Sequence, residues 1–183
     1  VLAKEVLPQL LRPRENDQSV RIWCAGCSTG EEAYTLAMLV KEYFETAPQP
    51  HPEVQIFATD IDEPALTFAR QGIYPVGIAD EVSPDRLKKF FIKKGQQYHI
   101  TKDIRDMVLF SLHNLINDPP FSRLDLISCR NLLIYLGSHL QKKLIPLFHY
   151  ALKPGGFLLL GPSESLSNHR ELFRTIDGKH RLS

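Results

Sequence analysis

Short apolar runs alternate with longer amphipathic stretches along most of the chain. Residues 20–24 and 54–59 are compact runs rich in β-branched and aromatic side chains, as buried strands are. Each is followed by apolar residues at helical spacing, over residues 31–45 and again from Pro64 to just before Gly72. Strands and helices that alternate in this way indicate a mostly parallel sheet with helices on both faces.

The second half of the chain repeats this pattern with one interruption. Residues 98–112 alternate apolar and polar positions, which predicts paired antiparallel strands. Two further apolar strands are expected at residues 125–129 and 157–160, joined by a helix that Ser138 caps and that Pro146 kinks or breaks. The remaining expected elements are a helix over residues 2–11, a polar connection over 12–19, a short helix from Pro84 through Phe91, a turn over 153–156, and a short helix with an edge strand within 171–183.

Length and composition narrow the class of protein. The 183 residues predict a single domain, residues 20–183, preceded by the end of a helical linker over residues 1–19. A formal charge of +1 gives no general electrostatic case for nucleic-acid or membrane binding. No apolar run approaches the ~20 residues of a spanning helix, and the first residues lack the pattern of a signal peptide. Three cysteines do not suggest a disulfide framework, so a reducing cytoplasm is the expected location.

A loop of small residues follows the first predicted strand. Residues 25–30 read AGCSTG, and glycine permits tight turns and close approach of a ligand to the backbone. Glu31 and Glu32 then open the next helix, where acidic side chains suit the helix dipole. The loop lacks the G-x-G-x-x-G pattern of NAD and FAD sites. We expect four of its residues to contact a nucleotide-type ligand: Gly26, Ser28, Thr29 and Gly30.

Other polar residues stand at the ends of the predicted strands, where open α/β sheets bind their ligands. Asp60 ends the second strand and is interpreted as an acceptor for the hydroxyls of a ribose, with a helix N-cap as the alternative. For Asp62 the N-cap is the favoured interpretation. Glu32 suits either a solvated first turn or an ammonium group of the ligand. Asn114 and Asn131 are individually uninformative, because asparagine is common in loops.

Five longer segments carry a family resemblance: WCAGCSTGEEAYTLAM, IFATDIDEPALTFARQGIY, FSLHNL, DLISCRNLLIYL and LKPGGFLLLGPSESL. Together they are similar to the CheR chemoreceptor-glutamate methyltransferases, which use S-adenosylmethionine and release S-adenosylhomocysteine. The resemblance covers nearly the whole chain, and DPPFSRLDLISCRNLLIYL is particularly similar to CheR domains fused to methylesterase, PAS and kinase modules. It implies an α/β, Rossmann-like class I methyltransferase fold, with a mostly parallel seven-stranded sheet and a small antiparallel β insertion at about residues 90–110.

The resemblance also implies which residues serve the reaction. Tyr135 is expected near the transferred methyl group, and Arg130 is a second candidate catalytic residue. An interface tyrosine and a structural clamp at a strand end remain the alternatives for these two. We also expect Ile61, beside Asp60, to contact the cofactor. The cofactor contacts that the resemblance implies are Glu32, Asp60, Asn114, Leu115, Arg130 and Asn131.

The implied reaction is methyl transfer from a sulfonium to an ionised glutamate carboxylate of a chemoreceptor-like protein. Such a displacement needs alignment and exclusion of water more than an acid or a base. This agrees with a sequence that shows no Ser-His-Asp arrangement. The family's N-terminal T-N-x-T-x-F-F-R-type motif does not occur in these residues. A non-catalytic sensor domain for S-adenosylmethionine or its product is therefore the alternative function.

Two short motifs resemble those of other protein classes. Residues 118–121, DPPF, are similar to the acidic-Pro-Pro-aromatic motif of amino-group methyltransferases, but they precede a strand, so a loop turn is favoured. Residues 23–27, WCAGC, are similar to a redox dithiol motif. A redox pair has its first thiol at a helix N-terminus, whereas Cys24 belongs to a strand here. No second ligand pair for zinc is in sight, so we expect no metal site.

Residues 86–105 form a basic run. Asp103 is the only acidic residue within it, against seven cations: Arg86, Lys88, Lys89, Lys93, Lys94, Lys102 and Arg105. A solvated face is the usual meaning of such a run. Since the family's acceptors are glutamates on acidic receptor helices, the favoured interpretation is a surface that steers such a helix to the enzyme. Nucleic acid is not expected, because no aromatic residues are interleaved as a stacking platform.

Overall fold

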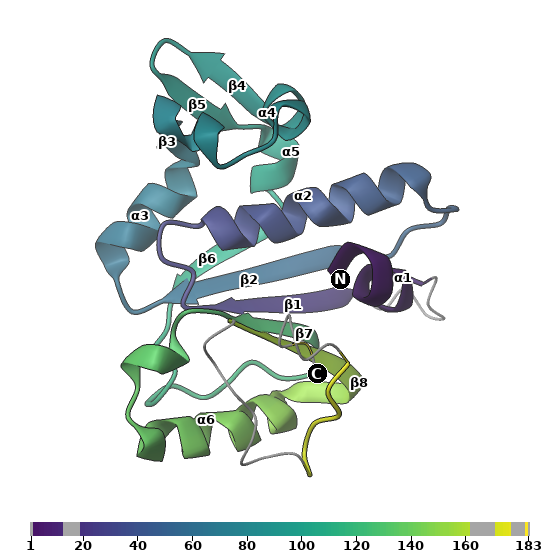
Figure 1. The fold of residues 1–183 in the computed structure, drawn as a ribbon, viewed down its shortest axis with the longest axis vertical. Helices are drawn as coiled ribbons and strands as arrows, with labels where there is room; N and C mark the ends of the chain where they lie inside the picture. Colours follow the sequence, from purple (N-terminus) through teal and green to yellow (C-terminus); the bar gives the residue numbers. More distant parts are fainter. Residues whose placement is uncertain (1, 13–18, 162–170, 177–181, 183) are drawn as a thin grey trace.

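A computed structural model describes residues 2–12, 19–161, 171–176 and 182 of the chain. Its main sheet has five parallel strands in the order β6-β2-β1-β7-β8 (Figure 1). The strands are β1 (Val20–Ala25), β2 (Val54–Asp60), β6 (Val108–Leu112), β7 (Leu124–Cys129) and β8 (Leu152–Leu160). An isolated antiparallel bridge also joins Leu159 to Leu182. The mostly parallel sheet expected from the sequence is confirmed, with five of the seven implied strands formed by the described residues.

Strand β1 lies at the centre of the sheet because both of its faces are apolar. Ile22 and Cys24 belong to the apolar cluster on one side, and Trp23 and Ala25 to the cluster on the other. Neighbouring side chains of a strand point to opposite faces, so one short run serves both layers. The carboxyl ends of β1, β2, β6 and β7 therefore meet along one edge of the sheet, which we call the carboxyl edge.

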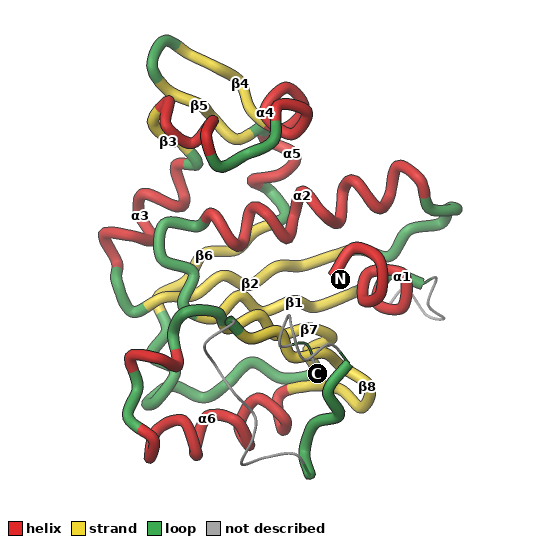
Figure 2. Tube along the Cα trace, viewed as in Figure 1, coloured by secondary structure: helices red, strands yellow, loops and turns green. Residues whose placement is uncertain are grey.

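Helices cover the two faces unequally (Figure 2). The helices α2 (Glu31–Thr46) and α3 (Glu63–Gln71) lie on one face, together with η1 (Leu2–Val6) and α1 (Leu7–Leu10). On the other face lies α6 (Ser138–Ala151), which buries Leu144, Ile145 and Phe148. The helix boundaries predicted for residues 31–45 and for Pro64 to Gly72 are confirmed, with Gly72 in the left-handed conformation after α3. No helix in these described ranges has the length and apolar character needed to cross a membrane.

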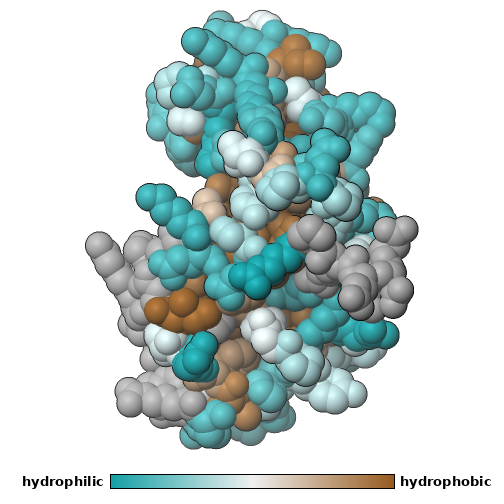
Figure 3. Space-filling model, turned by 90° about the vertical axis from the view of Figure 1, so that its right-hand side faces the viewer, coloured by the Kyte–Doolittle hydropathy of each residue, from teal (hydrophilic) through white to brown (hydrophobic). Residues whose placement is uncertain are grey.

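A second, antiparallel sheet stands apart from the main one (Figure 1). Its strands are β3 (Ile73–Pro75), β5 (Gln97–Ile100) and β4 (Phe91–Lys94), in that order. They are accompanied by η3 (Val76–Asp80), α4 (Pro84–Phe90) and α5 (Lys102–Arg105). We call residues 73–105 the insertion. It lies at the top of Figure 3, where most of the visible surface is hydrophilic.

The expectation of antiparallel strands throughout residues 98–112 is wrong in its second half. Residues 108–112 form β6, which pairs in parallel with β2 at the edge of the main sheet. An edge strand with one buried and one exposed face shows the same alternation as a hairpin strand, since Val108 is buried while Leu109 is exposed. The insertion thus begins earlier than the predicted residue 90 and ends before Val108.

Four predictions in the last third also need correction. Gly137 is the N-cap of α6, with extended backbone angles, and Ser138 is the first helical residue. The helix then continues through Pro146 to Ala151. Strand β8 begins at Leu152, so the expected turn at residues 153–156 lies within an irregular start of the strand. Residues 171–176 contain a turn and no helix, and residues 177–181 lie outside the described ranges.

Candidate functional site at the carboxyl edge

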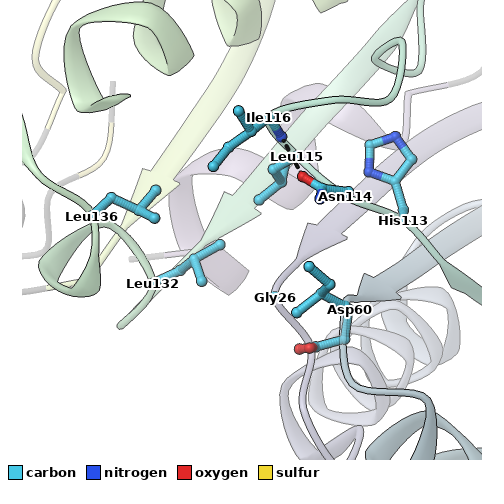
Figure 4. A pocket seen from close by; sticks show the side chains of 9 residues that line it. Gly26, Asp60, His113, Asn114, Leu115, Ile116, Leu132 and Leu136 are labelled. Carbon is cyan, nitrogen blue, oxygen red and sulfur yellow. Dashed lines mark hydrogen bonds between the residues drawn. The ribbon is translucent and has the colours of Figure 1, made fainter. Parts of the chain in front are cut away.

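A cavity of about 110 Å³ opens at the carboxyl edge of the sheet (Figure 4). Four chain segments meet there, each of them following a different strand: β1, β2, β6 and β7. The cavity is lined by Gly26, Asp60, Ile61, His113, Asn114, Leu115, Ile116, Leu132 and Leu136. Five of the residues proposed from the sequence as cofactor contacts are thus brought together: Gly26, Asp60, Ile61, Asn114 and Leu115.

The Asp60 carboxylate is held in place by backbone N–H groups. The amide of Ser28 donates to Asp60 Oδ2 at 2.8 Å, and the amide of Asp62 donates to Oδ1 at 3.0 Å. A carboxylate has about four lone-pair sites, so both oxygens keep capacity for further donors. Asp62 is the N-cap of α3 and accepts from the Ala65 amide at 3.2 Å, which confirms the interpretation favoured for it.

The loop after β1 is fixed against the end of β2. The amides of Gly26 and Cys27 both donate to the Thr59 carbonyl, at 2.8 and 2.9 Å. Gly26 has φ +73°, and a Cβ there would lie 2.9 Å from the Leu132 side chain. Glycine at this position therefore permits both the turn and the close approach of Leu132, which forms one wall of the cavity.

The segment after β6 forms the opposite wall. Figure 4 shows Leu115 and Ile116 on this side and Leu132 and Leu136 on the other. The Asn114 side-chain carbonyl accepts from the amide of Ile116 at 2.9 Å, so this asparagine also stabilises the turn. The wall therefore combines apolar side chains with the polar groups of Asn114 and His113.

His113 was not identified from the sequence, although it follows directly after β6. Its Nε2 lies 3.1 Å from the Pro119 carbonyl, which can only accept, so Nε2 is the protonated nitrogen. The ring packs edge-on against Trp23 and close to Phe121. Ile116, Leu132 and Leu136 were missed as well, because isolated apolar residues in loops give no chemical signal in a sequence. The only signal that could have pointed to them is their position in the connections that follow strands of the sheet.

Glu32 lies beside the cavity and is bonded inside the protein. The Ser128 hydroxyl, at the end of β7, donates to Glu32 Oε1. Burial raises the pKa of the Cys24 thiol well above its usual value, and the nearby Glu32 carboxylate raises it further. Glu32 thus supports the junction of β1, β7 and α2 in this structure, and its contact with a cofactor ammonium group remains a prediction.

The rest of the small-residue loop does not line the cavity. Gly30 has φ +93° at the N-cap of α2, and a Cβ there would lie 2.9 Å from the Ala69 side chain. This glycine permits the close packing of α2 on α3. The Thr29 hydroxyl donates to Glu31, and the Ser28 amide holds Asp60.

The residues proposed for the chemistry lie outside the cavity. Arg130 and Asn131 follow β7 and are exposed, and Asn131 has φ +57°. Tyr135 ends the short helix η4 (Leu133–Tyr135) and is 80% exposed. They belong to the same connection between β7 and α6 as Leu132 and Leu136, which are the two residues of this connection that line the cavity.

The two alternative motifs find structural roles. Residues 118–121 lie in the loop before β7, as favoured from the sequence, and Phe121 stacks on Phe57 with ring centroids 5.0 Å apart. Cys24 lies within β1, seven residues before α2 begins. Burial raises the pKa of Cys27 to about 12, so both thiols are protonated at neutral pH and unsuited to redox exchange. No metal-binding cluster of His, Cys, Asp or Glu occurs among the described residues.

The comparison with protein families identifies the chain. The model of the CheR methyltransferase SAM-binding domain matches residues 1–182. The chain belongs to this family. S-adenosylmethionine is therefore the cofactor of the domain, as the sequence motifs implied.

Curated relatives agree with this family. The chain is 38% identical to chemotaxis protein methyltransferase 1 of Pseudomonas aeruginosa, over 96% of this chain and 65% of that protein. It is 37% identical to the chemotaxis protein methyltransferase of Borreliella burgdorferi, over 93% of this chain and 62% of that protein. An uncharacterized 104.1 kDa protein of Rhodobacter capsulatus is 41% identical over 99% of this chain and 19% of its own length. The chain thus spans less than two thirds of each of these relatives.

Solved structures show the class I methyltransferase fold. The CMeT domain of the citrinin polyketide synthase matches 81% of this chain with a TM-score of 0.50 and 20% sequence identity. The glycopeptide N-methyltransferase MtfA, complexed with sinefungin, matches 86% with a TM-score of 0.50 and 15% identity. At such identities the likeness concerns the fold alone.

The residues around the cavity fit S-adenosylmethionine in their chemistry. A ribose offers hydroxyl donors, and the anchored Asp60 carboxylate is an acceptor with free lone pairs. An adenine ring offers a flat apolar surface, and Leu115, Leu132 and Leu136 present apolar side chains to the cavity. The glycine at position 26 leaves the backbone beside Asp60 open to close approach.

Proposed function

We propose that this chain is the cofactor-binding and catalytic domain of a protein-glutamate O-methyltransferase. It forms methyl esters on glutamate side chains of a chemoreceptor-like protein, in chemotaxis-type signal adaptation in the cytoplasm. The observation that carries the proposal is the cavity at the carboxyl edge, with Asp60 held by two backbone amides. Membership of the CheR family supports the choice of acceptor.

Each side chain has a simple task in the proposed reaction. When bound, S-adenosylmethionine supplies an electrophilic methyl group on its sulfonium. Asp60 accepts hydrogen bonds from the ribose, and the leucines around the cavity exclude water from the cofactor. The acceptor carboxylate is already ionised at neutral pH, so no general base is required. The Arg130 guanidinium, at the rim, can hold that carboxylate in line with the methyl group, and the Tyr135 hydroxyl can donate to it.

The remaining sequence-derived contacts take part in the proposal as rim and loop residues. Asn131 and Arg130 follow β7, in the connection that also supplies Leu132 to the cavity wall. Ser28, Thr29 and Gly30 lie on the loop that carries Asp60's amide donor. Glu32, which the Ser128 hydroxyl of β7 binds, is proposed to meet the amino-acid part of the cofactor. We also propose that the domain acts within larger signalling proteins with methylesterase, PAS or kinase modules.

One observation favours the second candidate function, a sensor that binds S-adenosylmethionine or S-adenosylhomocysteine without catalysis. Neither Arg130 nor Tyr135 lines the cavity, and Tyr135 is 80% exposed. A pure binding domain needs the cavity but not these two residues. The two functions therefore differ in the effect of removing them.

The test is a transfer assay with methyl-labelled S-adenosylmethionine and an acidic chemoreceptor fragment. Glutamyl methyl esters release labelled methanol in base, whereas N-methyl groups are stable. We expect base-labile label on the fragment, abolished when its acceptor glutamates are replaced by glutamine. Tyr135→Phe should lower transfer while calorimetric affinity for S-adenosylhomocysteine is kept. Tight binding of S-adenosylhomocysteine with no transfer by the intact protein would instead establish the sensor function.

A further inference from the structure

The exposed face of α6 is cationic and regular. His139, Lys142, Lys143 and Pro146 follow one another at i, i+3, i+4 and i+7, and all four are exposed. Residues at these spacings share one face of a helix. The opposite face, with Leu144, Ile145 and Phe148, is buried against the sheet. The lysines are thus held on a fixed scaffold and point away from the core.

No acidic side chain accompanies this face in the local sequence. Residues 126–163 contain no aspartate and no glutamate. Within the described part of the chain, Arg130, Lys142 and Lys143 form no ion pair. We call Arg130, His139, Lys142 and Lys143 the α6 surface. Its charge is available to a partner.

The α6 surface is connected rigidly to the cavity. The Gln141 side-chain amide, in the first turns of α6, donates to the carbonyls of Leu133 and Leu136, both at 2.9 Å. These bonds fix η4 and its flanking residues against α6. Leu136 itself lines the cavity, so α6 begins at the rim of the cofactor site (Figures 1 and 4). Ile134 and Tyr135, 48% and 80% exposed, add apolar contact area between the cavity and the lysines.

The basic run of the insertion is different, because much of its charge is used inside the protein. Arg86 binds Glu42 through two hydrogen bonds of 2.7 Å. Lys89 pairs with Glu45 and Lys102 with Asp106. Lys93 lies over the Tyr98 ring, 5.7 Å from its centroid. Of the seven cations that suggested a docking surface in the sequence, three are neutralised by carboxylates of the chain.

We infer that the α6 surface, rather than the insertion, binds the acidic segment of the protein that is methylated. The inference rests on the proposed function and names the site on this chain where its acceptor docks. An acidic segment lying along α6 would neutralise Lys142 and Lys143 and bring a glutamate to Arg130 at the rim of the cavity. Cations that border a reaction site raise the local concentration of an acidic substrate and its rate of association.

A charge-reversal experiment tests this inference on the intact protein. The probe is a fluorescent, alanine-based helical peptide with several glutamates on one face, and its counterpart with glutamines in their place. The variants are Lys142→Glu/Lys143→Glu and, as a matched control with the same change of charge, Lys88→Glu/Lys94→Glu on the insertion. Both pairs of lysines are exposed, so thermal melts should show folded proteins in each case.

We expect the α6 variant to weaken binding of the glutamate peptide about tenfold and the insertion variant less than about twofold, because only the former cations lie on the helix that is bonded to the cavity wall at Leu136. The glutamine peptide should bind neither form. Lys142→Ala/Lys143→Ala should give an intermediate loss, and about 300 mM salt should remove the difference. Equal losses in both charge-reversal variants, or a larger loss in the insertion variant, would overturn the inference. So would a single-stranded DNA of equal charge that competes as well as the glutamate peptide.

A calorimetric titration with S-adenosylhomocysteine separates this inference from the proposed function. Unchanged affinity in the α6 variant, together with weaker peptide binding, supports the docking surface. Failure of the unaltered protein to bind S-adenosylhomocysteine would contradict the proposed function itself. If the α6 variant keeps its affinity for the peptide while cofactor binding and methyl transfer persist, only the docking surface is contradicted.

Discussion

The carboxyl edge and the insertion use their charged side chains in opposite ways. In the insertion, Arg86 and Lys89 bind carboxylates of α2, and Lys41 of α2 lies 3.8 Å from Asp103. At the carboxyl edge, Asp60 is held by backbone amides, and Arg130 stands exposed. Paired side chains attach one part of a chain to another. A carboxylate that is held only by backbone amides, such as Asp60, can still accept hydrogen bonds from a ligand. A cation that has no carboxylate partner in the described part of the chain, such as Arg130, can bind an anionic one.

This difference has a structural consequence. The insertion packs on the main domain through α2 and the loop before it: Arg86 binds Glu42 of α2, and Tyr74 donates to the Thr29 carbonyl at 2.8 Å. The region around the cavity is built from four loops that converge from four strands. Variants in the insertion should therefore change stability and leave cofactor affinity alone, while variants around the cavity should change cofactor affinity.

The largest expected effect is that of Asp60→Ala on cofactor binding. Loss of a charged hydrogen-bond partner should weaken S-adenosylhomocysteine binding by roughly 1–3 kcal/mol, which calorimetry can measure. Asp62→Ala is the matched control, since Asp62 caps α3 and should lower the melting temperature with little change in affinity. An Asp60 variant with full affinity and reduced stability would show that the ribose role is wrong.

Two glycines of positive φ offer the next comparison. Gly26→Ala places a Cβ 2.9 Å from Leu132, whereas Gly95→Ala, with φ +58° in the β4–β5 turn, meets open space. Both should lose roughly 1–2 kcal/mol of stability through backbone strain. Only the Gly26 variant should also bind S-adenosylhomocysteine more weakly, because Leu132 must move out of the cavity wall. Equal affinities in the two variants would argue against this wall as part of the site.

The ion pair between Arg86 and Glu42 should give a smaller effect, and one that depends on pH. The hydrogen bonds from Arg86 lower the pKa of Glu42 below its usual 4.5. The stabilisation is therefore complete above pH 4.5 and is lost as the pH falls through the lowered pKa of the folded state. Glu42→Gln should cost about 1 kcal/mol at pH 7, and this cost should shrink as the pH falls through the lowered pKa of Glu42. Hydrogen exchange of residues 73–105 should report the loosening, with unchanged S-adenosylhomocysteine affinity.

The smallest effect is expected for the cysteines. Cys24 and Cys27 are buried thiols whose pKa values are raised, so neither is poised for thiolate chemistry. Replacing either with alanine should alter cofactor affinity only as far as packing changes. A reversible Cys24–Cys27 disulfide with a potential typical of redox enzymes would contradict this.

The sequence predicted the parallel sheet well because β1 and β2 are compact apolar runs with clear helix signals after them. It failed at residues 107–112, since an edge strand and a hairpin strand share one alternation pattern. It also took Ser138 for a helix cap, whereas the backbone of Gly137 provides the N-cap. Which sheet a strand joins and which residue becomes the N-cap depend on tertiary packing, and local residue preferences do not contain that information.

The candidate site was predictable where strand ends carry polar residues and less so elsewhere. Asp60 was identified because it ends a strand at the expected edge, whereas Asn114 was named only through the family resemblance. Leu132, Leu136 and His113 were not, because their function depends on which loops converge. The basic run is a different case, because the sequence shows only the number of charges, and the structure shows that Glu42 and Glu45 pair with two of them.

The most direct test of the account is a titration of the isotopically labelled protein with S-adenosylhomocysteine, followed by amide NMR shifts. The account predicts that the largest shifts fall at residues 26–30, 60–61, 113–116 and 130–136, around the cavity of the carboxyl edge. The amide shifts of residues in the insertion should not change. Another cavity lies between α2 and the insertion and is lined by Tyr34, Tyr74 and Arg86. Saturable shifts confined to that cavity would contradict the account.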